Sequence, residues 1–223
     1  MRKQGEFWSA LLGWPLTYED HDEVDVEPAE GDGCPLELVF VPVADPKSAK
    51  NRVHLDLASP TASAQAETVA RAEALGARRV DIGQGNVPWV VLADPEGNEF
   101  CVLDPRPEYA DTGALAAVVV DTTDVAASVA FWHAAAGWDV LRPESLRHPD
   151  RRGPWLEFLP AAPKTVKNRL HLDVAPYPDD TLDAEATRLR GLGATPADIG
   201  QGDVPWVVLT DPQGSEFCIL SPR

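Results

Sequence analysis

Two short segments of the chain place a histidine and an aspartate where they could do chemistry together. Residues 52–56 read RVHLD and residues 169–173 read RLHLD, so each segment holds an imidazole and a carboxylate two positions apart. Alternate side chains of a strand share a face, which brings His54 near Asp56 and His171 near Asp173. Such a pair can tune a general base, or the two polar groups can simply satisfy each other at the rim of a sheet. Both interpretations stay open.

A cysteine follows each segment at the same distance, Cys101 after the first and Cys218 after the second. With a histidine and an acid nearby, a thiolate can act as a nucleophile. The sequence identifies no donor for an oxyanion, however, and cysteine is more often a small buried apolar residue. The candidate catalytic residues are therefore His54, Cys101, His171 and Cys218, with their role left open.

These residues recur because the chain repeats itself. Residues 81–103 return as 198–220 and residues 50–56 as 167–173, both at a shift of 117 positions, and 7–14 return as 131–138 at a shift of 124. This period is far longer than the roughly 20–50 residues of a solenoid repeat, so we infer a duplicated domain. We predict a first domain over 1–104, a proline-containing linker over 105–113 and a second domain over 114–223.

Apolar patterning predicts the elements that position the candidate residues. Strands are expected in the second copy over 114–120, 139–141, 155–159, 169–174, 197–199, 206–209 and 216–220, and helices over 125–136 and 179–192. Gly137 should end the first of these helices. Each domain is thus expected to be α+β and to contain two βαβββ units. The first copy starts at its helix and lacks the opening strand, so either the chain begins upstream of Met1 or its first sheet is one strand short.

Several motifs together resemble the vicinal oxygen chelate superfamily, which includes glyoxalase I, bleomycin-resistance proteins and extradiol dioxygenases. They are NRVHLD at 51–56, DPEGNEF at 94–100, and Phe131-Trp132 followed by Gly137-Trp138. The resemblance is greatest to the glyoxalase-like branch and covers nearly the whole chain, twice. It implies a cup-shaped mixed sheet built from paired βαβββ units, with helices outside and a small-molecule cavity inside.

In metal-dependent members of the superfamily, the resemblance implies four ligands: a histidine and a glutamate on the first and fourth strands, and again on the fifth and eighth. Here the fifth-strand histidine matches His54 and His171, but the eighth-strand acid falls on Cys101 and Cys218. The first-strand and fourth-strand positions fall near Ala117, Val41 and Leu159. We therefore expect no metal of the usual kind and no cofactor. The alternative is a divalent metal at a non-standard site made of His171, Glu216 and Cys218, or of His54, Cys101 and Glu99.

Strand alternation sorts the repeated residues into those facing the helices and those facing the cup. The predicted ligand-binding residues of the cup face are Arg52, His54, Asp56, Trp89, Glu99, Cys101, Arg169, His171, Asp173, Trp206, Glu216 and Cys218. Arg52 and Glu99 could instead form an ion pair between two strands. The repeated G-Q-G of residues 83–85 is expected to be a tight strand connection rather than a phosphate loop, because no third glycine and no helix follow it.

Composition limits the partners. Against 19 lysines and arginines stand 36 acids, a net charge of −17, which excludes nucleic acid and anionic membranes as partners. Acidic surfaces can attract cationic ligands. Three cysteines and the absence of a leader or long apolar run indicate free thiols in the cytoplasm. We therefore predict a small-molecule-binding protein for a cationic, partly aromatic ligand, either a monomer with paired domains or a homodimer. The alternative is a metal-dependent enzyme of the glyoxalase or dioxygenase type.

Overall fold

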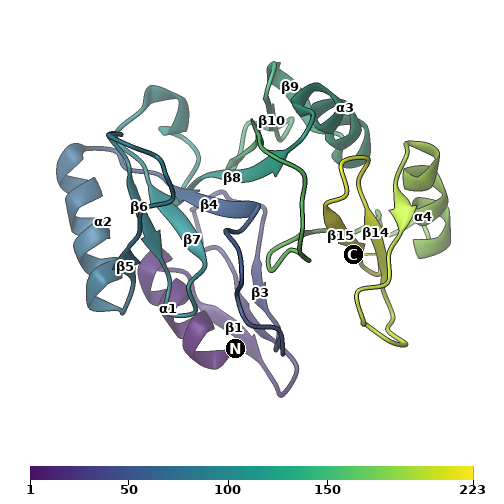
Figure 1. Cartoon of the computed structure of the whole chain (residues 1–223), viewed down its shortest axis with the longest axis horizontal. Helices are drawn as coiled ribbons and strands as arrows, with labels where there is room; N and C mark the ends of the chain where they lie inside the picture. Colours follow the sequence, from purple (N-terminus) through teal and green to yellow (C-terminus); the bar gives the residue numbers. More distant parts are fainter. Residues whose placement is uncertain (223) are drawn as a thin grey trace. The chain divides into compact units, whose positions relative to one another are not determined.

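The computed structural model describes residues 1–222 and confirms the α+β class and the repeated βαβββ order (Figure 1). The first copy begins with helix α1 (Arg2–Leu12), and no strand precedes that helix within the described residues. Its elements are α1, β1 (Leu16–Glu19), β2 (Val24–Val26), β3 (Leu38–Phe40), β4 (Val53–Leu57), α2 (Ala62–Ala74), β5 (Arg78–Arg79), β6 (Val90–Ala93) and β7 (Glu99–Val102). A short 3-10 helix, η1 (Pro107–Tyr109), follows in the expected linker.

The second copy has the complete order, with its opening strand present. Its elements are β8 (Leu115–Thr122), α3 (Val125–Ala136), β9 (Asp139–Arg142), β10 (Ser145–Arg147), β11 (Trp155–Pro160), β12 (Leu172–Val174), α4 (Leu182–Gly191), β13 (Thr195–Pro196), β14 (Val207–Thr210) and β15 (Glu216–Ile219). In Figure 1 this copy runs from teal to yellow.

The spatial grouping of the chain differs from the simple order of its repeats. One compact unit contains Met1–Lys50, His54–Val118 and Asp150–Trp155, and the other contains Asn51–Val53, Val119–Pro149 and everything from Leu156 onward. The first unit holds the sheet β1-β2-β3 and the strands β5-β6-β7-β4 with the beginning of β8. The second holds the end of β8 with β11-β10-β9, and the sheet β12-β15-β14-β13.

Helix boundaries follow local capping chemistry. Helix α3 begins after Asp124, whose side chain accepts a hydrogen bond from Ala127 N at 3.0 Å, and ends at Gly137, which has φ of 69°. Helix α4 begins at Leu182, three residues later than expected, because Thr181 caps it by accepting from Ala184 N at 3.2 Å. The N-caps Asp124 and Thr181 thus fix the residues at which α3 and α4 begin.

The strand predicted over 197–199 was wrong, since β13 lies at Thr195–Pro196 instead. Residues 198–201 form a turn in which Asp198 Oδ1 accepts from Gly200 N at 2.9 Å and Gln201 Oε1 accepts from Ile199 N at 2.8 Å. The first copy makes the same two contacts around Gly83. The G-Q-G segments are therefore strand connections whose own side chains occupy their backbone donors.

Each copy packs an aromatic cluster between its first helix and its last strand. Phe131 and Trp132 of α3 lie edge-on to Phe217 of β15, with ring centroids 5.9 and 5.3 Å away. Phe7 and Trp8 of α1 meet Phe100 of β7 in the same way, at 6.1 and 5.1 Å. These rings form the centre of each core.

The aspartate of the D-P-x-G turn ties that turn to the same helix. Asp211 Oδ1 accepts from the backbone of Gln213 and Ser215, both at 2.9 Å, and its Oδ2 accepts from Trp132 Nε1 at 3.2 Å. In the first copy, Asp94 makes the equivalent contacts with Glu96, Asn98 and Trp8. Burial raises the pKa of both carboxyl groups, although the hydrogen bonds oppose that rise. In both copies this aspartate thus has a structural role, because it links the D-P-x-G turn to the first helix of the copy.

Candidate functional site

The structure brings the histidine, aspartate and cysteine of each copy together into one cluster. Strands β4 and β7 run parallel with Asp56 opposite Cys101, and β12 and β15 run parallel with Asp173 opposite Cys218. Within each cluster one ligand atom from each of the three residues lies within 4.8 Å of the others. Each cluster is contained in a single compact unit. The shared face predicted from strand alternation is therefore a set of three converging side chains.

The first cluster is buried. His54, Asp56 and Cys101 expose only 8, 9 and 5% of their surface. His54 Nε2 lies 3.4 Å from Asp56 Oδ1, but neither this oxygen nor His54 Nδ1 has a hydrogen-bond partner among the described residues. Burial, and then the charge of Asp56, raises the pKa of the Cys101 thiol. The cluster thus places polar atoms in the interior without the hydrogen bonds that normally accompany them.

The second cluster has the same residues in an open setting. His171 Nε2 lies 3.1 Å from Asp173 Oδ1 and 3.4 Å from Cys218 Sγ. The side chains of His171 and Asp173 are 30 and 34% exposed, and only Cys218 is buried. Solvent and small molecules can therefore reach the imidazole and the carboxylate directly.

The two clusters differ because their strands have different neighbours. Strand β4 lies between β7 and β8, and Ala58 N at its end donates to Ala114 O at 3.0 Å. Strand β12 is the outermost strand of its sheet within residues 1–222, paired with β15 alone. It is also shorter than the predicted 169–174, and His171 lies just before its first residue. The side chains of an outer strand have a neighbouring strand on one side only, which accounts for the exposure of the second cluster.

The arrangement is not that of a cysteine protease triad. A triad histidine uses its two ring nitrogens separately, one toward the nucleophile and one toward the acid. In the second cluster Asp173 and Cys218 both contact the same nitrogen, Nε2 of His171. The three donor groups converge on a point instead of forming a relay, so this geometry does not favour nucleophilic catalysis by the thiol.

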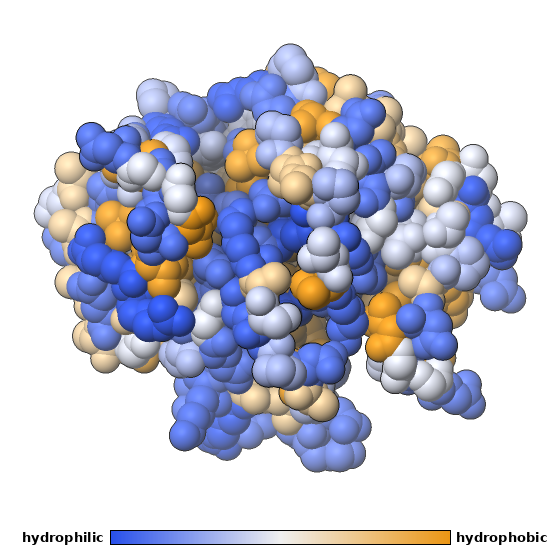
Figure 2. Space-filling view, in the orientation of Figure 1, coloured by the Kyte–Doolittle hydropathy of each residue, from blue (hydrophilic) through white to orange (hydrophobic). Residues whose placement is uncertain are grey.

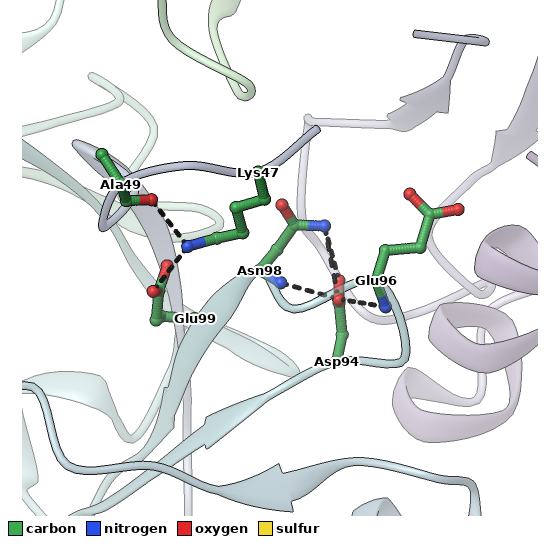
Figure 3. Close-up of polar contacts among 6 residues, drawn as sticks. All are labelled: Lys47, Ala49, Asp94, Glu96, Asn98 and Glu99. Atoms are coloured by element: carbon green, nitrogen blue, oxygen red, sulfur yellow. Dashed lines mark hydrogen bonds and ion pairs between the residues drawn. The ribbon is translucent and has the colours of Figure 1, made fainter. Parts of the chain in front are cut away.

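A pair of lysines that the sequence reasoning missed neutralises the two glutamates of the cup face. Lys47 Nζ lies 2.7 Å from Glu99 Oε1 and also donates to Ala49 O (Figure 3), and Lys164 pairs with Glu216 in the second copy. The signal was available, because P-K stands at 46–47 and again at 163–164, at the same shift of 117. Since the backbone of Asn168 also donates to Glu216 at 3.4 Å, the glutamate of the alternative metal site is already engaged.

The remaining predicted residues have varied surroundings. We expected Arg52 to pair with Glu99, but its guanidinium donates to the carbonyls of Ala162 and Asp121, at 2.5 and 2.8 Å. The half-buried Arg169 lies two residues before His171. The half-buried Trp89 has the guanidinium of Arg106 5.3 Å from its ring centre.

Trp206, the counterpart of Trp89, is 38% exposed. It lies just before β14, the strand in which Val208 is opposite Cys218. The counterpart of Arg106 is Arg223, which lies outside the described residues. The compact unit that holds the second cluster therefore also holds a partly exposed tryptophan.

A cavity of about 630 Å³ lies in the first unit. It is bounded by the end of α1, the residues after β4, helix α2 and the segment around η1, with Arg71 and Arg106 among its polar groups. None of the twelve predicted ligand-binding residues lines it. The face in Figure 2 is mainly hydrophilic, with apolar residues in small patches, and none of the helices of residues 1–222 is long and apolar enough to span a membrane.

Two copies of the βαβββ order, each with a converging histidine, aspartate and cysteine, define a tandem protein of the vicinal oxygen chelate class. The model of the glyoxalase-like domain matches the chain twice, over residues 1–103 and 117–220, and the chain belongs to that family.

Among solved structures, glyoxalase I from Zea mays is 16% identical with a TM-score of 0.64, over 99% of this chain and 88% of that one. Its V278E variant has the same identity and coverage, with a TM-score of 0.65. A putative dioxygenase from Bacillus subtilis is 12% identical with a TM-score of 0.55, over 98% and 80%. At these identities the likeness concerns the fold alone. The sequence has no significant match among curated proteins.

The charge of His171 should persist to unusually high pH. Burial alone would lower its pKa, but the hydrogen bonds and charges of Asp173 and Cys218 outweigh burial and raise the pKa from 6.5 to about 10. Because the folded-state pKa exceeds the unfolded one, this contribution to stability is fully present below pH 6.5 and is lost as the pH rises toward about 10.

NMR titration of the His171 imidazole should therefore give a midpoint near pH 10, well above the ordinary histidine value of 6.5. In Asp173→Asn the midpoint should fall, because the carboxylate that favours the imidazolium is gone. A His171 midpoint near 6.5 in the unmodified chain would contradict the ion pair seen in the structure.

Proposed function

We propose that the chain binds a small organic molecule at the open face of its second copy, around His171, Asp173, Cys218 and Trp206. The observation that carries this proposal is the exposure of a converging polar cluster, in a sheet whose strand β14 follows directly on the partly exposed Trp206. Ligand sites of proteins combine apolar or aromatic walls with a few polar groups that point to one place. The first copy offers the same residue types, but they are buried.

A cationic, partly aromatic ligand suits this face. The chain carries a net charge of −17, which raises the local concentration of cations. In the first copy Trp89 already has a cation, Arg106, over its ring. Tryptophan is the best of the aromatic residues for this contact, worth about 0.5–2 kcal/mol. An ammonium or guanidinium group of a ligand would be held in the same way by Trp206, and Asp173 supplies a carboxylate in the same compact unit.

The contacts of Glu216 count against the alternative of a metal-dependent enzyme at His171, Glu216 and Cys218. Lys164 and the backbone of Asn168 both contact this carboxylate, and a metal would have to displace them. Leu159 and Ala117, near the superfamily's fourth-strand and first-strand positions, offer no ligand atom. We therefore favour binding without the usual metal. A cytoplasmic location is part of the same proposal, supported by three free cysteines, Cys34, Cys101 and Cys218.

Two indoles of similar size and opposite charge test the proposal. Tryptamine should bind the full chain in ligand-observed NMR, and indole-3-acetate should bind markedly more weakly. Trp206→Ala and Asp173→Asn should each weaken tryptamine binding by about fivefold or more, given the usual worth of a cation–π or charged contact. Tyr177→Ala is the control, because it removes a side chain that is 84% exposed. Equal binding of the two indoles, or tryptamine binding unchanged in both site variants, would refute the proposal.

A further inference from the structure

We propose that His54, Asp56 and Cys101 of the first copy bind a divalent metal ion of the zinc type. This inference does not depend on the ligand face of the second copy. It concerns a set of ligands different from the one the superfamily resemblance implies, because Cys101 stands at the position of the eighth-strand acid and Asp56 is an additional ligand on the strand of His54. The two glutamate candidates take no part, since Glu99 is held by Lys47.

The first support is a carboxylate oxygen of this cluster that is buried without a hydrogen bond. Asp56 Oδ1 makes no hydrogen bond within residues 1–222, and the Asp56 side chain is about nine-tenths buried. A carboxylate taken out of water costs several kcal/mol unless it is paired or coordinates a metal. A cation between the three side chains would remove that cost, whereas an apolar neighbour would not.

The second support is the spacing of the donor atoms. In tetrahedral coordination with Zn–N near 2.0–2.1 Å and Zn–S near 2.3 Å, neighbouring ligand atoms lie roughly 3.3–3.6 Å apart. His54 Nε2 and Asp56 Oδ1 are separated by 3.4 Å, and all three donors lie within 4.8 Å of one another. Small side-chain rotations would bring the donor atoms from within 4.8 Å of one another to the spacing of a tetrahedral site. The parallel register of β4 and β7, with Asp56 opposite Cys101, holds the backbone in place for this.

The third support is the chemistry of the donors. An imidazole nitrogen, a carboxylate oxygen and a thiolate sulfur together suit zinc, which accepts all three, and leave a fourth position for another ligand. A hard cation such as magnesium would not choose the thiolate. The set of donors therefore selects among metals, and binding should depend most strongly on Cys101.

The second cluster does not support the same inference. Its imidazole and carboxylate are about one-third exposed, so water can solvate them, and His171 Nε2 already contacts both Asp173 and Cys218. None of these three residues has a buried atom without a partner. This contrast provides matched control variants within one chain.

The test measures metal directly on the full chain. Protein purified without chelator and then equilibrated with zinc should hold about one zinc per chain by elemental analysis after desalting. Cobalt substitution should add a thiolate-to-cobalt charge-transfer band. Cys101→Ser and His54→Gln should each lower bound zinc at least tenfold and abolish the band, whereas Cys218→Ser and His171→Gln should retain both.

If Cys101→Ser or His54→Gln prevents folding, Asp56→Asn tests the same site, because asparagine preserves the shape of the aspartate side chain. It should weaken zinc binding while circular dichroism shows an unchanged fold. An unmodified chain that holds no zinc after equilibration would overturn the proposal, as would zinc that survives Cys101→Ser but is lost in Cys218→Ser. Tryptamine binding is measured on the same samples, so failure of the metal site is distinguished from failure of the ligand face.

Discussion

Replacing Phe217 with alanine should lower the free energy of unfolding by about 3–5 kcal/mol, the usual cost of removing a buried aromatic ring. Phe217 is fully buried and lies edge-on to both Phe131 and Trp132. Its removal leaves a cavity between α3 and β15 and also ends the ring contacts, worth about 0.5–1.5 kcal/mol each. Urea unfolding followed by circular dichroism measures the change.

Two further variants make this result specific. Phe100→Ala should have a similar cost in the first copy, where Phe100 contacts Phe7 and Trp8 in the same geometry. Tyr177→Ala should change stability by less than about 0.5 kcal/mol, because its side chain is 84% exposed. If Phe217→Ala were as mild as Tyr177→Ala, the aromatic cluster could not be the centre of the second core.

Replacing Asp211 with alanine should lower the free energy of unfolding by about 3 kcal/mol. The substitution leaves the backbone of Gln213 and Ser215 and the indole nitrogen of Trp132 without their acceptor. Each buried donor left without a partner costs about 1–3 kcal/mol, reduced where water can replace the lost oxygen. Urea unfolding again gives the measurement, and Asp94→Ala in the first copy should behave alike.

Asp198→Ala is the matched control for this prediction. Asp198 also accepts a hydrogen bond from a turn, from Gly200 N at 2.9 Å, but it is exposed, and among the described residues its side chain has no hydrogen bond to a helix. Its loss should cost about 0.5–1 kcal/mol. Equal effects of the two substitutions would show that the D-P-x-G aspartate serves only its own turn and does not hold the helix.

Much of the fold was predictable because the repeat and the helix signals are local. The helix predicted at about 125–136 was confirmed as Val125–Ala136, since Asp124 and Gly137 are strong cap residues. The βαβββ order followed from the same signals. The misplaced strand at 197–199 shows the limit, because Asp198 and Gln201 bond to nearby backbone and keep this segment in a turn.

The site was predictable in composition but not in environment. Alternation along one strand predicted that His54 and Asp56 share a face, and the repeat pointed to Cys101 and Cys218. Nothing local distinguishes the buried cluster from the open one, because that difference depends on whether a strand such as β8 lies alongside. The lysine that engages each glutamate was overlooked for a simpler reason, since 52 positions separate the members of each pair.

The outer position of β12 has a consequence for rates. A molecule can reach His171 by diffusion alone, so exchange there can be fast and its occupancy can follow changing concentrations. Whatever enters beside Cys101 must wait for strands to separate transiently, so its arrival and departure would be slow. Duplication has thus given one chain two chemically equivalent places that respond to their surroundings on different timescales.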